Sequence, residues 1–166
     1  MLGDLERLPG CAGVKIFMGA STGSLLLADD EGLTRALASG TRRISFHAED
    51  EDRLQARKAM ALSGRPETHP VWRDAACARI AGERLMRLAR AAGRKVHVLH
   101  ATTADEMPVY AAHRDIATVE VTVNHLSMTA PDCYERIGNF AQMNPPIREK
   151  AHQDALWAAV RSGLID

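Results

Sequence analysis

The sequence predicts an α/β protein in which parallel strands alternate with helices. Short runs rich in β-branched residues are separated by longer helical patterns, which is typical of repeated βα units. The short runs are mostly apolar, as strands covered on both faces must be. Of the 166 residues, 46% are hydrophobic and 25% are charged, proportions typical of a globular chain and not of a disordered one.

Four runs are expected to form the strands, at residues 13–18, 43–47, 95–100 and 118–123. Helices are expected over residues 30–40, 49–62, 70–92, 103–113 and 149–162. Their ends carry recognisable signals, such as Pro70 in a first turn and a capping box of Thr103 and Glu106. Two loops remain, at 19–24 and 125–148, and the sequence predicts one domain over residues 1–166.

Charge and cysteine content limit the class of protein. Lys plus Arg number 21 and Asp plus Glu number 21, so no general attraction to nucleic acid or to an anionic membrane is expected. The expected partner is a small molecule or a protein. Cys11, Cys77 and Cys133 form no CxxC pair, which favours ordinary thiols in a reducing compartment. Without a secretory signal or a run of about 18 apolar residues, a cytoplasmic location is expected.

Lys15 lies inside the first apolar run and is the least expected residue of the strands. Burying an ammonium group is costly unless it is paired, neutralised or chemically altered. One interpretation is structural: the aliphatic stem is buried and the charged end reaches the end of the strand. The other is that Lys15 belongs to a functional site.

His47 and His100 each end a predicted strand. The carboxyl ends of parallel strands lie along one edge, so the two imidazoles are expected to converge there, where they are natural zinc ligands. A single histidine at such a place is more often a hydrogen-bonded structural residue. His97 is an odd number of positions before His100, so alternation predicts that only one of the two faces the interior, and His100 is preferred. His125, directly after the fourth strand, is a weaker candidate.

With these residues identified, the chain resembles the middle of a dihydroorotase of the amidohydrolase superfamily. The resemblance rests on Gly-Val-Lys15-Ile-Phe-Met-Gly-Ala-Ser-Thr-Gly, on Phe-His47-Ala-Glu-Asp-Glu, on Val-His-Val-Leu-His100-Ala-Thr-Thr-Ala-Asp-Glu and on Met-Asn144-Pro-Pro-Ile-Arg148. The motifs occur in the family's order and span residues 13–166.

The resemblance implies part of a (β/α)₈ TIM-type barrel, about strands four to seven, whose edge binds one or two zinc ions. Lys15 matches the lysine whose carbamate bridges the metals, and His47 and His100 match metal-binding histidines. Asn144 matches the asparagine that contacts the substrate, whereas His125 carries no implied role.

The family's first pair of metal-binding histidines and its catalytic aspartate have no counterpart in residues 1–166. A complete barrel takes about 250 residues. The sequence is therefore expected to be a central fragment of a longer enzyme. It carries no catalytic residue of its own and is expected to be inactive alone.

The implied activity of the intact relative is reversible, zinc-dependent hydrolysis of dihydroorotate to carbamoyl-aspartate, a step of pyrimidine biosynthesis. An allantoinase or a hydantoinase is the first alternative, because these enzymes share the lysine and the histidines. A non-catalytic barrel that assembles with a transcarbamoylase, or with its own copies, is the second. The third is a small, doubly wound α/β binding domain with no relation to these enzymes.

Overall fold

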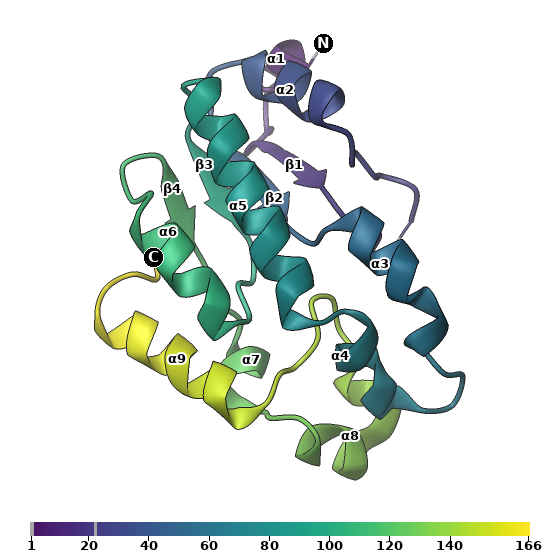
Figure 1. Cartoon of the computed structure of the whole chain (residues 1–166). Helices are drawn as coiled ribbons and strands as arrows, with labels where there is room; N and C mark the ends of the chain where they lie inside the picture. Colours follow the sequence, from purple (N-terminus) through teal and green to yellow (C-terminus); the bar gives the residue numbers. More distant parts are fainter. Residues whose placement is uncertain (1, 22) are drawn as a thin grey trace.

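In the computed structural model, residues 2–21 and 23–166 are described, and within them the chain forms one parallel sheet of four strands (Figure 1). The strands are β1 (Val14–Phe17), β2 (Ile44–His47), β3 (Val96–Val98) and β4 (Ala117–Val119), in the order β1-β2-β3-β4. Every neighbouring pair is parallel. The α/β class and the presence of a strand at each of the four predicted places are thereby confirmed.

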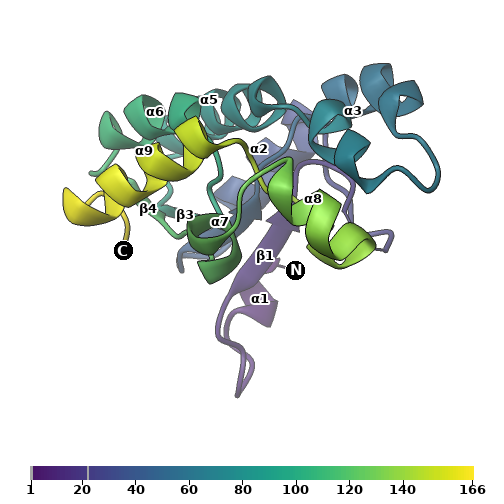
Figure 2. The ribbon, with the colours of Figure 1, turned by 90° about the horizontal axis from the view of Figure 1, so that it is seen from below.

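Helices connect the strands and continue beyond the last one. They are α1 (Leu2–Leu5), α2 (Asp30–Ala38), α3 (Glu51–Arg57), α4 (His69–Trp72), α5 (Ala75–Ala91), α6 (Met107–Ala111), α7 (Val123–Ser127), α8 (Asp132–Ile137) and α9 (Lys150–Arg161). Short 3₁₀ helices are η1 (Lys58–Met60), η2 (Pro66–Thr68), η3 (Ala104–Glu106) and η4 (Gly138–Ala141). Helices α5, α6 and α9 lie together on one side of the strands (Figure 2).

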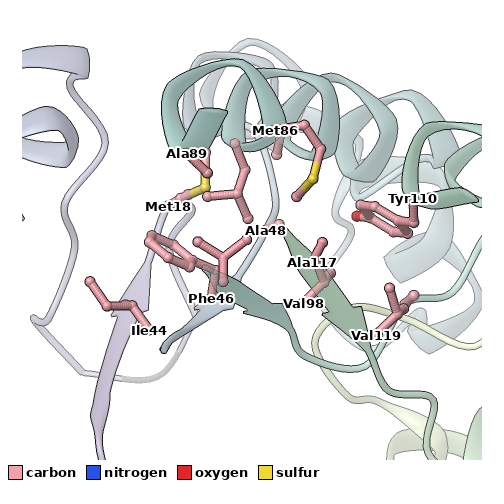
Figure 3. Packing of buried hydrophobic residues seen from close by; sticks show 14 of the residues in the cluster. Met18, Ile44, Phe46, Ala48, Met86, Ala89, Val98, Tyr110, Ala117 and Val119 are labelled. Atoms are coloured by element: carbon pink, nitrogen blue, oxygen red, sulfur yellow. The ribbon is translucent and has the colours of Figure 1, made fainter. Parts of the chain in front are cut away.

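The hydrophobic core lies between this helical layer and one face of the sheet. Phe46 and Val98 point from the central strands toward Met86 and Ala89 of α5 (Figure 3). The buried core side chains of the strands are those of Ile16, Ile44, Phe46, Val96, Val98, Ala117 and Val119. Because successive residues of a strand point to opposite faces, the intervening side chains lie on the other face.

That other face is polar. The register aligns Lys15 with Ser45, Ser45 with His97, and His97 with Thr118, so these four side chains form a row across the sheet. Lys15 is exposed and the others are half-buried. Several of them line a shallow hollow of about 440 Å³. The sheet therefore has one apolar face under the helices and one polar face that carries the candidate lysine.

The predicted helix over residues 70–92 is wrong in one respect, because it is divided into α4 and α5. The backbone at Arg73 leaves the helical region, with φ −92° and ψ 66°. Asp74 then caps α5 by accepting a hydrogen bond from the backbone N–H of Cys77. Pro70 does lie in a first turn, as predicted, but in the first turn of α4. The break places the guanidinium of Arg73 in the interior of the protein.

The prediction for residues 118–148 is also partly wrong. The strand ends at Val119, and the Thr122 side chain accepts a hydrogen bond from the His125 backbone N–H to cap α7. The expected long loop contains α8 and η4. Polar residues alternate with Val over residues 118–123, which has the period of a strand and explains the error.

Other expectations are confirmed. The capping box of Thr103 and Glu106 is present, and α2 and α9 lie within the predicted ranges. Cys77 and Cys133 are buried and Cys11 is half-buried, and all three, which lie in the described part of the chain, are free thiols. Among the helices of the described residues, none has the length and apolar character of a membrane span. Thr22, in the predicted 19–24 loop, lies outside the described residues.

The loops that follow β1 and β2 touch at Gly19. A Cβ added at Gly19 lies 2.5 Å from the Glu49 carbonyl oxygen, whereas the nearest atom to a Cβ at Gly13 is 3.7 Å away. We predict that Gly19→Ala lowers the free energy of unfolding by about 1–3 kcal/mol, because backbone must move to relieve the overlap. Gly13→Ala is the matched control and changes stability by less than about 0.5 kcal/mol. Urea unfolding of both variants measures the difference, and equal values contradict the close approach.

Candidate metal site

His47 and His100 meet beyond the carboxyl ends of β2 and β3. The distance between His47 Nδ1 and His100 Nε2 is 3.2 Å. The two ring centroids are 5.0 Å apart and the rings are nearly perpendicular. The predicted convergence of these two imidazoles, 53 residues apart in the chain, is thus present in the structure.

The prediction that strand alternation places His97 and His100 on opposite faces is wrong. β3 ends at Val98, and the backbone at His100 adopts a positive φ of 40°, so the period of a strand does not extend to His100. His97 itself faces the polar side of the sheet, in the row with Lys15. Its ring nitrogens lie 2.8 Å from Thr118 Oγ1 and 3.2 Å from Glu120 Oε2. His100 reaches His47 because the chain turns there.

Lys15 lies on the same face of the sheet as His47. Phe17 is aligned with His47 and is two residues from Lys15, so the three side chains share one side. The Lys15 Nζ is 4.5 Å from the centroid of the Phe17 ring, which is 5.4 Å from that of His47. The expectation that Lys15 is buried is wrong, because its face of the sheet is not covered by the helices.

A buried ion pair lies directly behind His47. Glu49 Oε2 is 2.9 Å from His47 Nε2, and Glu49 also accepts hydrogen bonds from the guanidinium of Arg73. All three side chains are at most 2% exposed. Burial by itself raises the pKa of Glu49, but hydrogen bonds from His47 and Arg73 together with the charge of Arg73 outweigh it and lower the pKa to about 2. Glu49 is therefore a carboxylate.

Two histidines of the site are held in the neutral form. Burial is the main cause that lowers the pKa of His100 to about 3. Burial also lowers the pKa of His125 to about 4. His125 donates from Nε2 to the Pro145 carbonyl at 3.0 Å, and its Nδ1 lies 2.7 Å from Thr122 Oγ1. His125 thus supports the neighbouring loop, and its ring nitrogens are already occupied.

Asn144 is held at the same end of the sheet by two segments distant in sequence. Its Oδ1 accepts a hydrogen bond from His69 Nε2 at 3.0 Å, and its Nδ2 donates to Ser21 Oγ at 3.3 Å. His69 Nε2 also lies 3.1 Å from the Met143 carbonyl oxygen. His69 directly precedes Pro70, and nothing in its local sequence pattern indicates that it contacts Asn144.

The paired imidazoles fit a zinc ion. Two nitrogens bound to one tetrahedral zinc at about 2.0–2.1 Å are about 3.3 Å apart, close to the 3.2 Å between His47 Nδ1 and His100 Nε2. His100 Nδ1 is buried and has no hydrogen-bond partner among the described residues. Within residues 2–21 and 23–166, no group of three or more His, Cys, Asp or Glu side chains is arranged around one point. The two histidines are therefore a partial set of ligands.

Comparison with known proteins identifies the family. No protein-family model matches the chain. The chain is 32% identical to a dihydroorotase of Methanosarcina mazei, over 99% of its own length and 39% of the relative. It is 34% identical to an allantoinase of Streptomyces avermitilis, over 98% of its own length and 38% of the relative. The chain belongs to the cyclic amidohydrolase family.

Solved structures of this family contain the same arrangement of strands and helices. A dihydropyrimidinase from Brevibacillus agri matches with a TM-score of 0.88 and 27% identity, over 99% of this chain and 38% of that one. A D-hydantoinase matches with a TM-score of 0.87 and 26% identity, over 99% and 38% respectively. The chain spans less than two fifths of the length of each of these four relatives. The α/β arrangement with parallel strands is thus part of their TIM-barrel fold.

Sequence reasoning missed Arg73 and assigned no role to Glu49. Glu49 lies within the motif Phe-His47-Ala-Glu. Its position, two residues after the end of a predicted strand, was a usable signal. Arg73 stands in a predicted helix beside other arginines, so only the break between α4 and α5 distinguishes it.

The neutral histidines predict a loss of stability in mild acid. The pKa of His125 is lower in the folded chain than the unfolded value of about 6.5, so its contribution is complete above pH 6.5 and is lost as the pH falls toward 4. We expect His125 alone to reduce the free energy of unfolding by about 3 kcal/mol over this range. The His125→Gln variant removes about 1.4 kcal/mol per pH unit from the slope. Urea unfolding from pH 7 to pH 4 measures both slopes, and identical slopes contradict the burial effect.

Proposed function

We propose that this chain supplies part of the metal-dependent ring-opening site of a dihydroorotase-type cyclic amidohydrolase. The observation that carries the proposal is the 3.2 Å separation of two ring nitrogens at the carboxyl ends of neighbouring strands, which is the separation expected of two ligands of one zinc ion. The relatives named dihydroorotase match 99% of the chain in one case and 92% in another. Strands β1 to β4 correspond in this proposal to strands four to seven of a (β/α)₈ barrel.

His47 and His100 hold the metal. A zinc ion held there would supply Lewis-acid chemistry for hydrolysis of an amide. Both imidazoles must be neutral to bind a cation, and the low pKa of His100 keeps its ring unprotonated at neutral pH. His100 thus needs no proton release when metal binds near pH 7.

Lys15 takes part after carboxylation in this proposal. Its neutral amine Nζ attacks the carbon of CO₂, a C–N bond forms as one C=O π pair moves to oxygen, and the amine proton passes to solvent, which gives a carbamate anion. The exposed position of Lys15 on the polar face leaves Nζ accessible to CO₂. A carbamate replaces a cation by an anion on the side of the sheet that His47 shares, which favours metal binding there.

Asn144 contacts the substrate in this proposal. Because His69 and Ser21 fix both ends of its amide, Asn144 has a defined donor and a defined acceptor direction. A preorganised amide of this kind orients a cyclic substrate with little loss of side-chain entropy.

The first test is zinc binding by the purified 166-residue chain. We predict that wild type binds zinc and that His47→Ala or His100→Ala lowers the affinity by more than about 100-fold, because loss of a ligand costs more than loss of a hydrogen-bond partner behind it. His97→Ala is the matched control, since His97 is bonded to Thr118 and Glu120 on the strand. Competition with a chromophoric chelator measures the affinities. Equal affinities for all four proteins contradict the site.

Activity requires a complete set of ligands, so the chain alone is predicted not to cyclise carbamoyl-aspartate above a metal-free control. A chimera tests the function directly: residues 13–166 replace the matching segment of the Methanosarcina mazei dihydroorotase. We predict cyclisation of carbamoyl-aspartate by the chimera and at least a 100-fold loss in its His47→Ala form. A folded, zinc-loaded chimera that opens allantoin but not dihydroorotate supports allantoinase, the alternative favoured by the 34% identity to that enzyme.

A further inference from the structure

The Glu49 carboxylate lies directly behind the His47 ring. Glu49 Oε2 lies 2.9 Å from His47 Nε2, the ring nitrogen that points away from His100. Glu49 is 0% exposed and His47 is 1% exposed, so no water competes for this contact. A carboxylate only accepts hydrogen bonds, so a proton on His47 Nε2 is the arrangement that this contact favours.

Arg73 removes the remaining freedom of Glu49. Its Nε lies 3.1 Å from each carboxylate oxygen, and its Nη2 also donates to Oε2. The guanidinium is a fixed fork that only donates, so it holds the carboxylate in one plane. The same Nη2 donates to the Ala20 carbonyl oxygen at 2.7 Å. The ion pair is thus fixed to the loop that follows β1.

The backbone of Arg73 extends this connection to the far end of the chain. The Arg73 carbonyl oxygen accepts a hydrogen bond from Arg148 Nη1, and Arg148 Nε lies 3.4 Å from Thr102 Oγ1. Arg148 is 4% exposed and closes the motif that contains Asn144. Segments after β1, β2 and β3 and the loop before α9 therefore share one buried anchor.

We propose that Glu49, fixed by Arg73, is a positioning residue that orients the His47 ring and sets its tautomer, so that Nδ1 presents a lone pair toward His100. The inference rests on the metal site of the proposed function, but its first consequence concerns the chain without metal. With the proton on Nε2, Nδ1 is the only His47 nitrogen free to bind a cation. A carboxylate behind a ligating histidine also raises the basicity of the ring.

A suitable control pair exists at the opposite end of β2. Glu6 is 3% exposed, receives hydrogen bonds from the backbone of Thr41 and Arg42, and pairs with Arg94 at 2.7 Å. Glu6→Gln therefore damages a buried carboxylate–guanidinium pair that has no contact with His47. Glu49→Gln is the test variant, since its amide has one acceptor oxygen and presents donor hydrogens to His47 or to Arg73.

The experiment compares wild type, Glu49→Gln, Glu49→Asp and Glu6→Gln. Long-range ¹H–¹⁵N spectra of the metal-free protein at pH 7.5 are expected to show a slowly exchanging His47 Nε2 proton in wild type and Glu6→Gln, and to lose it in Glu49→Gln. Zinc affinity is expected to fall 10- to 100-fold in Glu49→Gln relative to Glu6→Gln, with a partial loss in Glu49→Asp. Cobalt-substituted samples are expected to show altered visible absorption in Glu49→Gln alone.

The outcomes separate this inference from the proposed function. A wild-type chain that binds no zinc but shows the His47 Nε2 proton contradicts the metal site and supports the role of Glu49. A wild-type spectrum with the proton on Nδ1 overturns the inference, even when Glu49→Gln fails to fold. Equal zinc affinities and equal spectra for Glu49→Gln and Glu6→Gln overturn it as well.

Discussion

The parallel register of β1 and β2 is the constraint on which the candidate site depends. It aligns Phe17 with His47, and Lys15 with Ser45, so that the lysine and the histidine share one face. A slip of one residue moves every side chain of a strand to the other face. Ile16 and Phe46 prevent that slip, because both are buried in the core under the helices. Hydrophobic burial on one face of the sheet thus determines which side chains lie on the other face.

Buried charge gives the site its rigidity and makes it sensitive to change. Glu49 and Arg73 are almost completely shielded from water, so the charge of each is compensated by the charge of the other. Removing one partner of such a pair typically costs about 3–5 kcal/mol, because an uncompensated charge stays in the interior. The pair lies where segments after three strands meet. The same contacts therefore stabilise the end of the sheet and hold His47 in place.

Strong local sequence signals predicted the secondary-structure elements well. The predictions failed where tertiary contacts determined the backbone conformation. The apolar runs located every strand, and the Thr103–Glu106 capping box located its helical turn. The division of the expected helix after Trp72 was missed, because Arg73 has an ordinary helix propensity and leaves the helix to reach Glu49. Tertiary hydrogen bonds outweighed propensity at that position.

The sequence by itself determined the fold class, the polar residues at the strand ends and the order of the family motifs. These follow from periodicity and composition, which depend on residues close together in the chain and can be read directly from the sequence. Tertiary structure alone decided that His100 turns by a positive φ to face His47, that Lys15 is exposed, and that Arg73 and Glu49 form a buried pair. Each of these features joins segments far apart in the chain, and the energy that fixes them exists only once those segments are packed together.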